Sequence, residues 1–247
     1  MKRYLFEINF IGKNYHGWQI QKNAVTVQET INKSITNMLH FKDKLDFVGC
    51  GRTDKGVHAE QFFFHVDLPD VKNINKLIYR LNNILPSDIS VNKCIAVDNE
   101  FHARFSAISR TYQYRIIQQK NPFLNDFSAY IGYDLDFELM NICAQKIKKY
   151  RDFKSFTKVH NGVNNFICNI TDAFWFKDEH QLIFSIKANR FLRNMVRAIV
   201  GTIILVGRHK INIDQFCQII ESRDRSNAGP SATAKGLFLT NVEYLLK

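Results

Sequence analysis

The sequence predicts an α+β fold of two related lobes, with a mixed, mainly antiparallel central sheet flanked by helices. Short β-favouring runs bounded by glycine or turn residues alternate with amphipathic helical stretches. Both halves of the chain share the order strand, helix, two or three strands, helix, strand, although their sequences do not repeat. No Gly/Ser-rich linker separates them. We therefore expect tightly joined lobes at residues 1–120 and 121–247, with an active-site cleft between the lobes.

The composition indicates a globular protein with a polyanionic partner. The chain has 247 residues, of which 45% are hydrophobic and 23% are charged, so it is long and apolar enough to bury a sizeable core. Its formal net charge is +11, which favours a partner rich in phosphate. Nucleic acid fits better than a membrane, because no basic block adjoins an apolar anchor. The alternative is a solvated basic surface that has no partner.

The cysteines and the apolar runs indicate the compartment. Five cysteines are scattered without a C-x-x-C pair, so neither a disulfide framework nor a zinc site is expected. The longest apolar run, residues 198–207, is too short to span a bilayer, and the N-terminus does not resemble a signal peptide. We expect a cytoplasmic protein that does not bind membranes.

In the first lobe the periodicity predicts strands and two helices. Thr26 with Glu29 forms a capping-box pattern that opens a helix reaching Leu39, and Pro86 ends a second helix. The second helix is expected at 73–85, and strands are expected at 4–10, 47–51, 61–66, 89–97 and 110–118.

In the second lobe Asp136 is expected to cap a helix that continues to Tyr150. The polar segment 151–165 is predicted to be a loop. Apolar residues from Leu192 to Val206 recur at intervals of three and four, which predicts a long helix. The remaining elements are strands at 166–176, 182–188 and 236–246 and a short helix at 213–222, with a loop at 223–235.

The polar stretch Gly51–Ala59 is the first candidate site. Apolar runs on both sides predict two strands, and polar loops tethered to a sheet are common places for functional residues. The loop holds one carboxylate, Asp54, together with cations and a histidine. The alternative is a simple turn in which Asp54 accepts bonds from nearby backbone amides.

Arginines gather at the start of the long helix. Arg193 and Arg197 are four residues apart and are expected to share a face, with Arg190 near it. Three cations are unfavourable at a helix N-terminus, so a nearby anion is expected, either a carboxylate such as Asp54 or a phosphate. Arg104 and Arg110 belong to a second basic cluster. For each cluster taken alone, solvation at the surface is the alternative.

Several familiar sites are excluded. The chain has no phosphate-binding P-loop, no G-x-G-x-x-G and no H-E-x-x-H motif. The histidines in the first 102 residues are too dispersed to indicate a metal site, so no metal is expected.

Several segments, in order, resemble the tRNA pseudouridine synthase A family. Gly51–Ala59 is similar to the catalytic loop of that family. The other matching segments are Gly12-x-x-Tyr15-x-Gly17-Trp18-Gln19-x-Gln21, Phe101–Ala107 with Arg110-x-Tyr112-x-Tyr114, Asn189–Arg197 with Val200-Gly201, and Ala228-Gly229-Pro230 with Gly236–Leu239. Together they span nearly the whole chain.

The resemblance implies a homodimeric enzyme that isomerises uridine to pseudouridine in the anticodon stem-loop of tRNA, at positions 38–40, without a cofactor. It implies that Asp54 is the catalytic carboxylate, that Arg197 pairs with it, that Arg52 helps to displace the base and that Tyr112 contacts the target base. Further substrate-binding residues are expected at His58, Arg104, Arg110 and Arg193.

The chemistry agrees with the resemblance. Glycosidases use two carboxylates, whereas the motif here supplies one, which suits an isomerisation in which no water is activated. The route stays open among attack by Asp54 on the sugar, attack on the base and proton abstraction from the sugar. Two alternatives also stay open: an enzyme for another tRNA position or another RNA, and a catalytically idle RNA-binding protein on the same scaffold. The resemblance implies nothing for residues 151–165.

Overall fold

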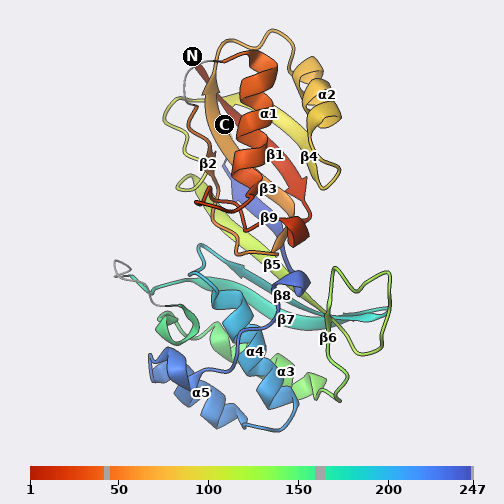
Figure 1. Cartoon of the computed structure of the whole chain (residues 1–247). Helices are drawn as coiled ribbons and strands as arrows, with labels where there is room; N and C mark the ends of the chain where they lie inside the picture. Colours follow the sequence, from red (N-terminus) through yellow and green to blue (C-terminus); the bar gives the residue numbers. More distant parts are fainter. Residues whose placement is uncertain (42–44, 159–164, 246–247) are drawn as a thin grey trace. The chain divides into compact units, whose positions relative to one another are not determined.

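The computed structural model describes residues 1–41, 45–158 and 165–245. That part contains nine strands and five α-helices, which confirms the predicted α+β class (Figure 1). Five described strand pairs (β1 with β3, β1 with β4, β2 with β3, β5 with β8 and β7 with β8) are antiparallel and β5 with β6 is parallel, so the pairing is mixed and mainly antiparallel, as predicted. Two compact units are present, Met1–Ile108 with Leu239–Lys247 and Ser109–Phe238. Separate domains divided at residue 120 stay a prediction.

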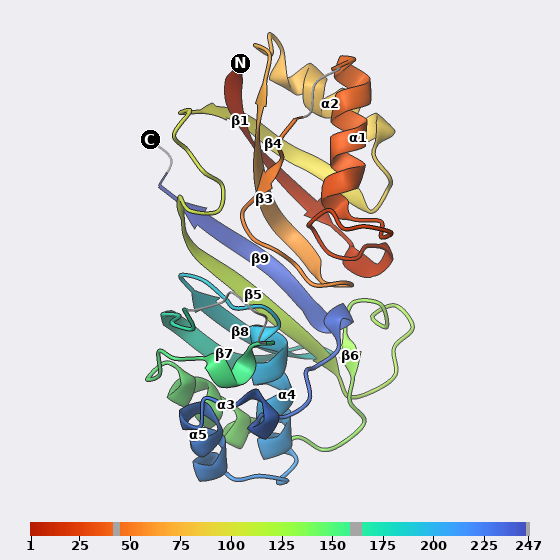
Figure 2. The ribbon, with the colours of Figure 1, turned by 60° about the vertical axis from the view of Figure 1, so that its left-hand side comes forward.

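The first unit is built on strands in the order β4-β1-β3-β9, with helices α1 and α2 on one face (Figures 1 and 2). Its core is aromatic: Phe6 of β1 stacks on Phe64 of β3 at 4.9 Å between ring centroids, and Trp18 packs on Phe62 at 4.4 Å. The elements are β1 (Lys2–Phe10), α1 (Val27–Leu39), β2 (Val48–Gly49), β3 (His58–Leu68), α2 (Ile74–Ile84), β4 (Ile89–Val97) and β9 (Leu237–Tyr244), which begins in the second unit.

The second unit has strands in the order β5-β8-β7, and helices α3, α4 and α5 cover one face of them (Figure 2). Tyr114 lies opposite Phe184, which lies opposite Trp175, and all three are buried. The elements are β5 (Ala107–Ile117), β6 (Ala129–Tyr130), α3 (Phe137–Ile147), β7 (Ile170–Asp178), β8 (Gln181–Ala188), α4 (Met195–Gly207) and α5 (Ile213–Glu221).

The helix starts follow the predicted caps. The Thr26 hydroxyl accepts the Glu29 amide at 3.3 Å, and Asn73 and Asp136 cap α2 and α3 in the same way. The Glu29 carboxylate forms an ion pair with Lys33 at 2.6 Å, so the side chain of Glu29 is directed along the helix. The caps therefore fix where these three helices begin.

Some expected element bounds were wrong. The strand expected at 47–51 is only Val48–Gly49, and the strand expected from residue 166 begins at Ile170. The described part of segment 151–165 is a loop with one short 3-10 turn, as predicted, but it is less polar in its packing than expected, since Phe153 and Phe156 are fully buried and Phe156 packs towards Phe216 of α5. Residues 159–164 of that segment lie outside the described residues. No helix in the described ranges is long and apolar enough to cross a membrane.

Candidate active site

The loop that carries Asp54 connects β2 to β3 and is held by the turn at residues 12–17. The Gly56 amide donates to the Tyr15 carbonyl at 3.2 Å, and the Val57 amide donates to the carbonyl of Asp54 at 3.2 Å. Gly56 has a φ of 78°, which a non-glycine residue rarely adopts. The half-buried Asp54 thus stands on a backbone whose path is fixed by hydrogen bonds.

Two glycines of the neighbouring turn allow the backbones to approach closely. A Cβ atom on Gly12 would lie 2.0 Å from the Val57 carbonyl oxygen, and one on Gly17 would lie 2.2 Å from that of Thr53. Gly17 also has a φ of 84°. Any side chain at either position would push the turn away from the Asp54 loop. This contact explains why the Gly12-x-x-Tyr15-x-Gly17 segment belongs with the Asp54 loop.

His58 lies under this loop. Its side chain is buried, with a residue exposure of 2%, and its Nδ1 accepts the Gly12 amide at 3.2 Å. The structure therefore gives His58 a role in joining β3 to the 12–17 turn, and its expected contact with substrate stays a prediction. Arg52, by contrast, is exposed.

Arg104 lies in a turn of the first unit, at residues 102–106. It is exposed, and its guanidinium carbon lies 5.4 Å from the centroid of the Phe105 ring. That geometry is typical of a cation–π contact. The turn places a positive charge and an aromatic face next to each other.

Two predicted substrate residues share a face of β5 in the second unit. Tyr112 packs edge-to-face against Phe191, with 5.1 Å between ring centroids and an interplanar angle of 88°. Arg110 donates through Nη1 to the Asn189 carbonyl at 2.8 Å. Both side chains are thereby fixed by the segment that leads into α4, which combines a flat aromatic surface with a cation.

Arg197 is the third residue of α4, and its position is fixed by residues 228–233, which we call the strap. Its Nε donates to the Ala232 carbonyl at 2.7 Å, while the Ala232 amide donates to the Arg197 carbonyl at 2.9 Å. The strap is held further by Asn194, whose amide bonds Ser231 Oγ at 2.5 Å, and by Thr202, whose hydroxyl accepts the Gly229 amide at 3.0 Å. Helix and strap thus orient the guanidinium together.

The arginines of this segment do not share a helical face. Helix α4 begins at Met195, because Asn194 has a φ of 65° and breaks the helical path. Arg190 and Arg193 therefore precede the helix. The expectation that Arg193 and Arg197 share one helical face is wrong. Arg193 is exposed, and its carbonyl accepts the Thr157 hydroxyl at 3.1 Å.

Tyr114 is a site-supporting residue that the sequence did not single out. Its buried hydroxyl donates to the Thr233 carbonyl at 2.9 Å and so ties β5 to the strap. Burial raises the pKa of Tyr114 to about 12, which keeps the hydroxyl protonated as a donor. The sequence offered two signals without a role for it: its place two residues after Tyr112 on the same strand, and its inclusion in the Arg110-x-Tyr112-x-Tyr114 segment.

The predicted site residues fall into two groups. The first unit carries Asp54, Arg52, His58 and Arg104, and the second carries the other four, namely Tyr112, Arg110, Arg193 and Arg197. Within each unit the structure fixes the members described above, and their meeting at one reaction centre stays a prediction. No group of three or more His, Cys, Asp or Glu side chains that could hold a metal ion occurs in the described part of the chain.

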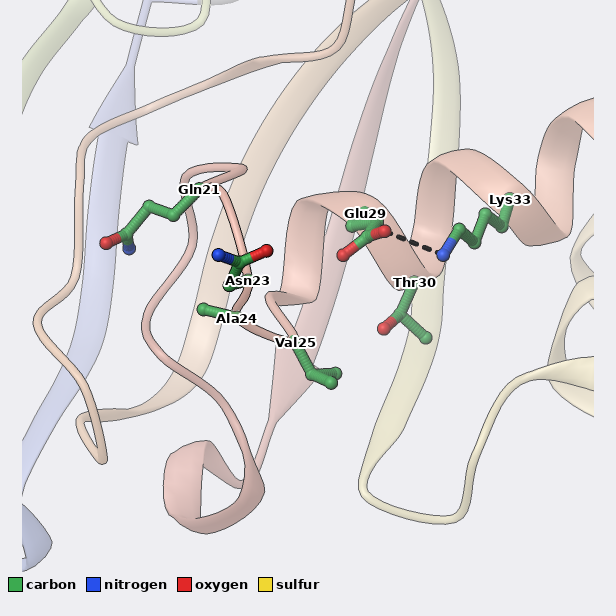
Figure 3. Close-up of a pocket in the computed structure, with 7 residues that line it drawn as sticks. All are labelled: Gln21, Asn23, Ala24, Val25, Glu29, Thr30 and Lys33. Atoms are coloured by element: carbon green, nitrogen blue, oxygen red, sulfur yellow. Dashed lines mark ion pairs between the residues drawn. The ribbon is translucent and has the colours of Figure 1, made fainter.

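A separate hollow of about 330 Å³ lies beside the N-terminal end of α1 (Figure 3). It is lined by the 21–25 turn and by helix residues that include the Glu29–Lys33 ion pair. Of the described residues that line it, none is a predicted site residue. The hollow therefore adds nothing to the candidate active site.

The sequence matches proteins of known activity along almost its whole length. The model of a family described as tRNA pseudouridine synthase matches residues 150–245. The tRNA pseudouridine synthase A of Bacteroides fragilis is 45% identical over 246 residues, covering 99% of this chain and 97% of the relative. That of Porphyromonas gingivalis is 45% identical over 248 residues (99% and 98%), and that of Acetivibrio thermocellus is 39% identical over 243 residues (96% and 97%).

Proposed function

Because the chain belongs to the tRNA pseudouridine synthase A family, we propose that it forms pseudouridine at positions 38–40 of the anticodon stem-loop. It is an RNA pseudouridine synthase, an isomerase that modifies tRNA. The observation that carries the proposal is similarity over nearly the full chain, combined with a loop that presents Asp54 on a fixed backbone. We further propose that it acts as a homodimer in the cytoplasm.

The chemistry assigns Asp54 the central role. The glycosidic C–N bond breaks, the uracil turns within the site, and its C5 bonds to the same sugar carbon. The C5 proton is then lost while the original nitrogen gains one, so the overall change is an isomerisation without a co-reactant. We propose that ionised Asp54 serves as the nucleophile or the base in this reaction, because it is the one carboxylate of the loop Gly51–Ala59.

We propose that Arg197 pairs with Asp54. A neighbouring guanidinium favours the charged form of a carboxylate and orients it. The bond to Ala232 occupies Nε and fixes the direction in which the two terminal nitrogens of Arg197 point. This supports a role in which the strap presents the guanidinium in one orientation.

The Arg197 proposal predicts a loss of rate rather than of tRNA binding. Arg197→Ala should lower the rate of pseudouridine formation by about a hundredfold or more, since losing one close charge partner costs about 3 kcal/mol or more when the site is enclosed. Single-turnover kinetics measures this effect, and Arg208→Ala, at the other end of α4, is the matched control. A wild-type rate in Arg197→Ala would show that no such pair exists.

The remaining residues are proposed to hold the RNA. A base inside a structured stem must be turned out before its C5 can be reached. We propose that exposed Arg52 fills the vacated space and that Tyr112 stacks on the extruded base. Arg104, Arg110 and Arg193 are proposed to contact the tRNA, with the net charge of +11 supporting phosphate binding. Buried His58 is proposed to serve substrate binding through the Asp54 loop, which it joins to the 12–17 turn.

Mapping the modified positions tests the function. Purified protein is incubated with unmodified tRNA transcripts, and pseudouridines are located by a chemistry that marks them in sequencing. The account expects signals at uridines 38, 39 and 40, each lost when that uridine is replaced by cytidine. Signals only at other positions would overturn the assignment of the stem-loop, and no pseudouridine at all would indicate an idle RNA-binding protein.

A further inference from the structure

The turn at residues 102–106 is held rigidly by its own backbone bonds and by the sheet of the first unit. The Ala103 amide donates to Nδ1 of buried His65 at 3.0 Å, and the Tyr244 hydroxyl donates to the Ala103 carbonyl at 2.6 Å. The His102 amide donates to Ser106 Oγ at 3.0 Å, and the Ser106 amide donates back to the His102 carbonyl at 2.8 Å. Few backbone torsions in this turn are left to vary.

The tip of this turn displays an aromatic ring. Phe105 is 75% exposed, and its ring lies 4.4 Å from the His102 ring at an interplanar angle of 37°. The Arg104 guanidinium carbon lies 5.4 Å from the same ring. The Arg104 and Phe105 amides both donate to His102 Nδ1, at 3.1 and 3.3 Å, so the three side chains start from one fixed backbone.

A single exposed phenylalanine needs no explanation by itself. This ring differs because a cation and a second ring support it on a turn that cannot readily fold away. Proteins that hold unpaired nucleotides use this combination, in which the base stacks on an aromatic face while a nearby cation meets the phosphate. The sequence predicted an RNA contact for Arg104 but assigned no role to Phe105.

We propose that Phe105, flanked by Arg104 and backed by His102, is a stacking platform for an unpaired base of the RNA substrate. This inference rests on the proposed action on tRNA. It adds a second aromatic contact, in the first unit, to the one proposed for Tyr112 in the second unit. Phe105 acts in binding and takes no part in the isomerisation.

An RNA base fits this surface better than a protein partner does. The residues beside Phe105 in the turn are an arginine and a serine, so the ring stands alone among polar neighbours. Protein interfaces instead place aromatic anchors inside a wider desolvated patch. The net charge of +11 also favours a polyanion.

The rigid turn sets the expected size of the effect. Because the ring is already ordered, stacking does not require the turn to be ordered first. Loss of one base–aromatic stack typically lowers affinity by about 1–3 kcal/mol, which is about 5- to 150-fold. Loss of one phosphate contact instead lowers the salt dependence of binding by about one ion.

The experiment compares four variants of the full-length protein in equilibrium binding to unmodified tRNA across a salt series. Phe105→Ala should weaken binding at least about fivefold with an unchanged salt slope, and Phe105→Trp should restore the affinity. Arg104→Gln should reduce the slope. Phe123→Ala is the matched control, because Phe123 is 90% exposed and lies in the second unit; it should leave the affinity within about twofold.

Three results would overturn the proposal. The first is that the Phe105→Ala protein binds tRNA as tightly as the wild type, and the second is that it changes the salt slope as the loss of a charge contact does. The third is that the Phe105→Ala protein has a lower molar mass than the wild type in sedimentation while its affinity per site is unchanged. The last result would make Phe105 a contact between copies of the chain. Pseudouridine formation by the wild-type protein is measured in parallel, so a failure of the proposed function is seen separately.

Discussion

The two regions proposed to form the reaction centre are held in place by different means. In the first unit the Asp54 loop is fixed mainly by backbone contacts, with Gly12 and Gly17 packed directly against the Val57 and Thr53 carbonyls. In the second unit Arg197 is fixed mainly by hydrogen bonds between helix and strap, with further bonds at Asn194 and Thr202, and the strap also packs closely against the backbone of α4 at Gly201.

The difference predicts how the position of each charged side chain responds to substitution of the residues around it. A backbone–backbone contact has no side chain that can move aside, so an added methyl group must displace the chain itself. A network of side-chain bonds has several members, and the loss of one leaves the others in place. We therefore expect the position of the carboxylate to depend steeply on two glycines, and that of the guanidinium to depend gradually on the residues that bond to the strap and more steeply on Gly201 alone.

The largest effect is expected from Gly17→Ala. A Cβ atom there would lie 2.2 Å from the Thr53 carbonyl oxygen, at a φ of 84°. Together the strain and the clash should lower the free energy of unfolding by about 2–4 kcal/mol. Denaturant titration measures the loss.

Gly51→Ala is the matched control for this change, because a Cβ atom at Gly51 would have no neighbouring atom within 4 Å. Its free energy of unfolding should stay within about 0.5 kcal/mol of the wild type. Equal stability of the two variants would show that the close approach at Gly17 does not hold the loop.

A smaller effect is expected from Gly201→Ala in α4. A Cβ atom there would lie 1.8 Å from the Pro230 carbonyl oxygen and would push the strap away from the helix. The clash costs about 1–3 kcal/mol and the gain in helix propensity offsets about 1 kcal/mol of it, so stability should fall by up to about 2 kcal/mol. The turnover rate should fall as well, because Arg197 bonds to the strap.

Gly207→Ala in the same helix is the control for Gly201→Ala. Its Cβ would approach the flexible Met140 side chain, whose sulfur can move. Thermal unfolding of both variants checks the comparison. A Gly201→Ala protein that is as stable and as active as Gly207→Ala would contradict the proposed role of the strap.

The smallest effect concerns pH. Burial, with Arg3 and His102 nearby, lowers the pKa of His65 from 6.5 to about 4. The unfolded chain therefore binds more protons than the folded one between these values, so the stability contributed by neutral His65 is full above about pH 6.5 and is lost as the pH falls towards 4. We expect a loss of about 1 kcal/mol between about pH 7 and pH 5.5.

A variant of His65 isolates this contribution. His65→Asn can keep an acceptor for the Ala103 amide without titrating, so its stability should depend less steeply on pH than that of the wild type. His180→Asn, at an exposed position, should leave the slope unchanged. A wild-type slope in His65→Asn would remove His65 as the source of the effect.

The features that the sequence predicted correctly are those set by interactions between residues close together in the chain. Thr26 and Asp136 cap helices where expected because capping involves residues three apart, and the apolar spacing located the helix faces. The start of α4 was missed because the left-handed φ of Asn194 is stabilised by a distant partner, Ser231. The burial of Phe153 and Phe156 was missed because they stand in a polar stretch, and Phe156 meets Phe216 of α5 far along the chain.

The candidate site shows the same difference between what nearby residues determine and what distant contacts determine. Asp54 and Arg197 were found through ordered motifs that resemble a family, and spacing alone left each of them with an ordinary alternative. The bonds that hold them involve Tyr15 and Ala232, which lie about 40 residues from Gly56 and 35 residues from Arg197 in the sequence. Such contacts between distant segments leave no periodic signal, so only the structure could supply them.

Release of tritium from tRNA labelled at uridine C5 tests the central claim most directly, because forming the new bond at C5 expels that proton. Asp54→Ala should abolish release while tRNA binding, measured in parallel, stays within about threefold of the wild type. Release at the wild-type rate from Asp54→Ala would contradict the claim that Asp54 is the catalytic carboxylate.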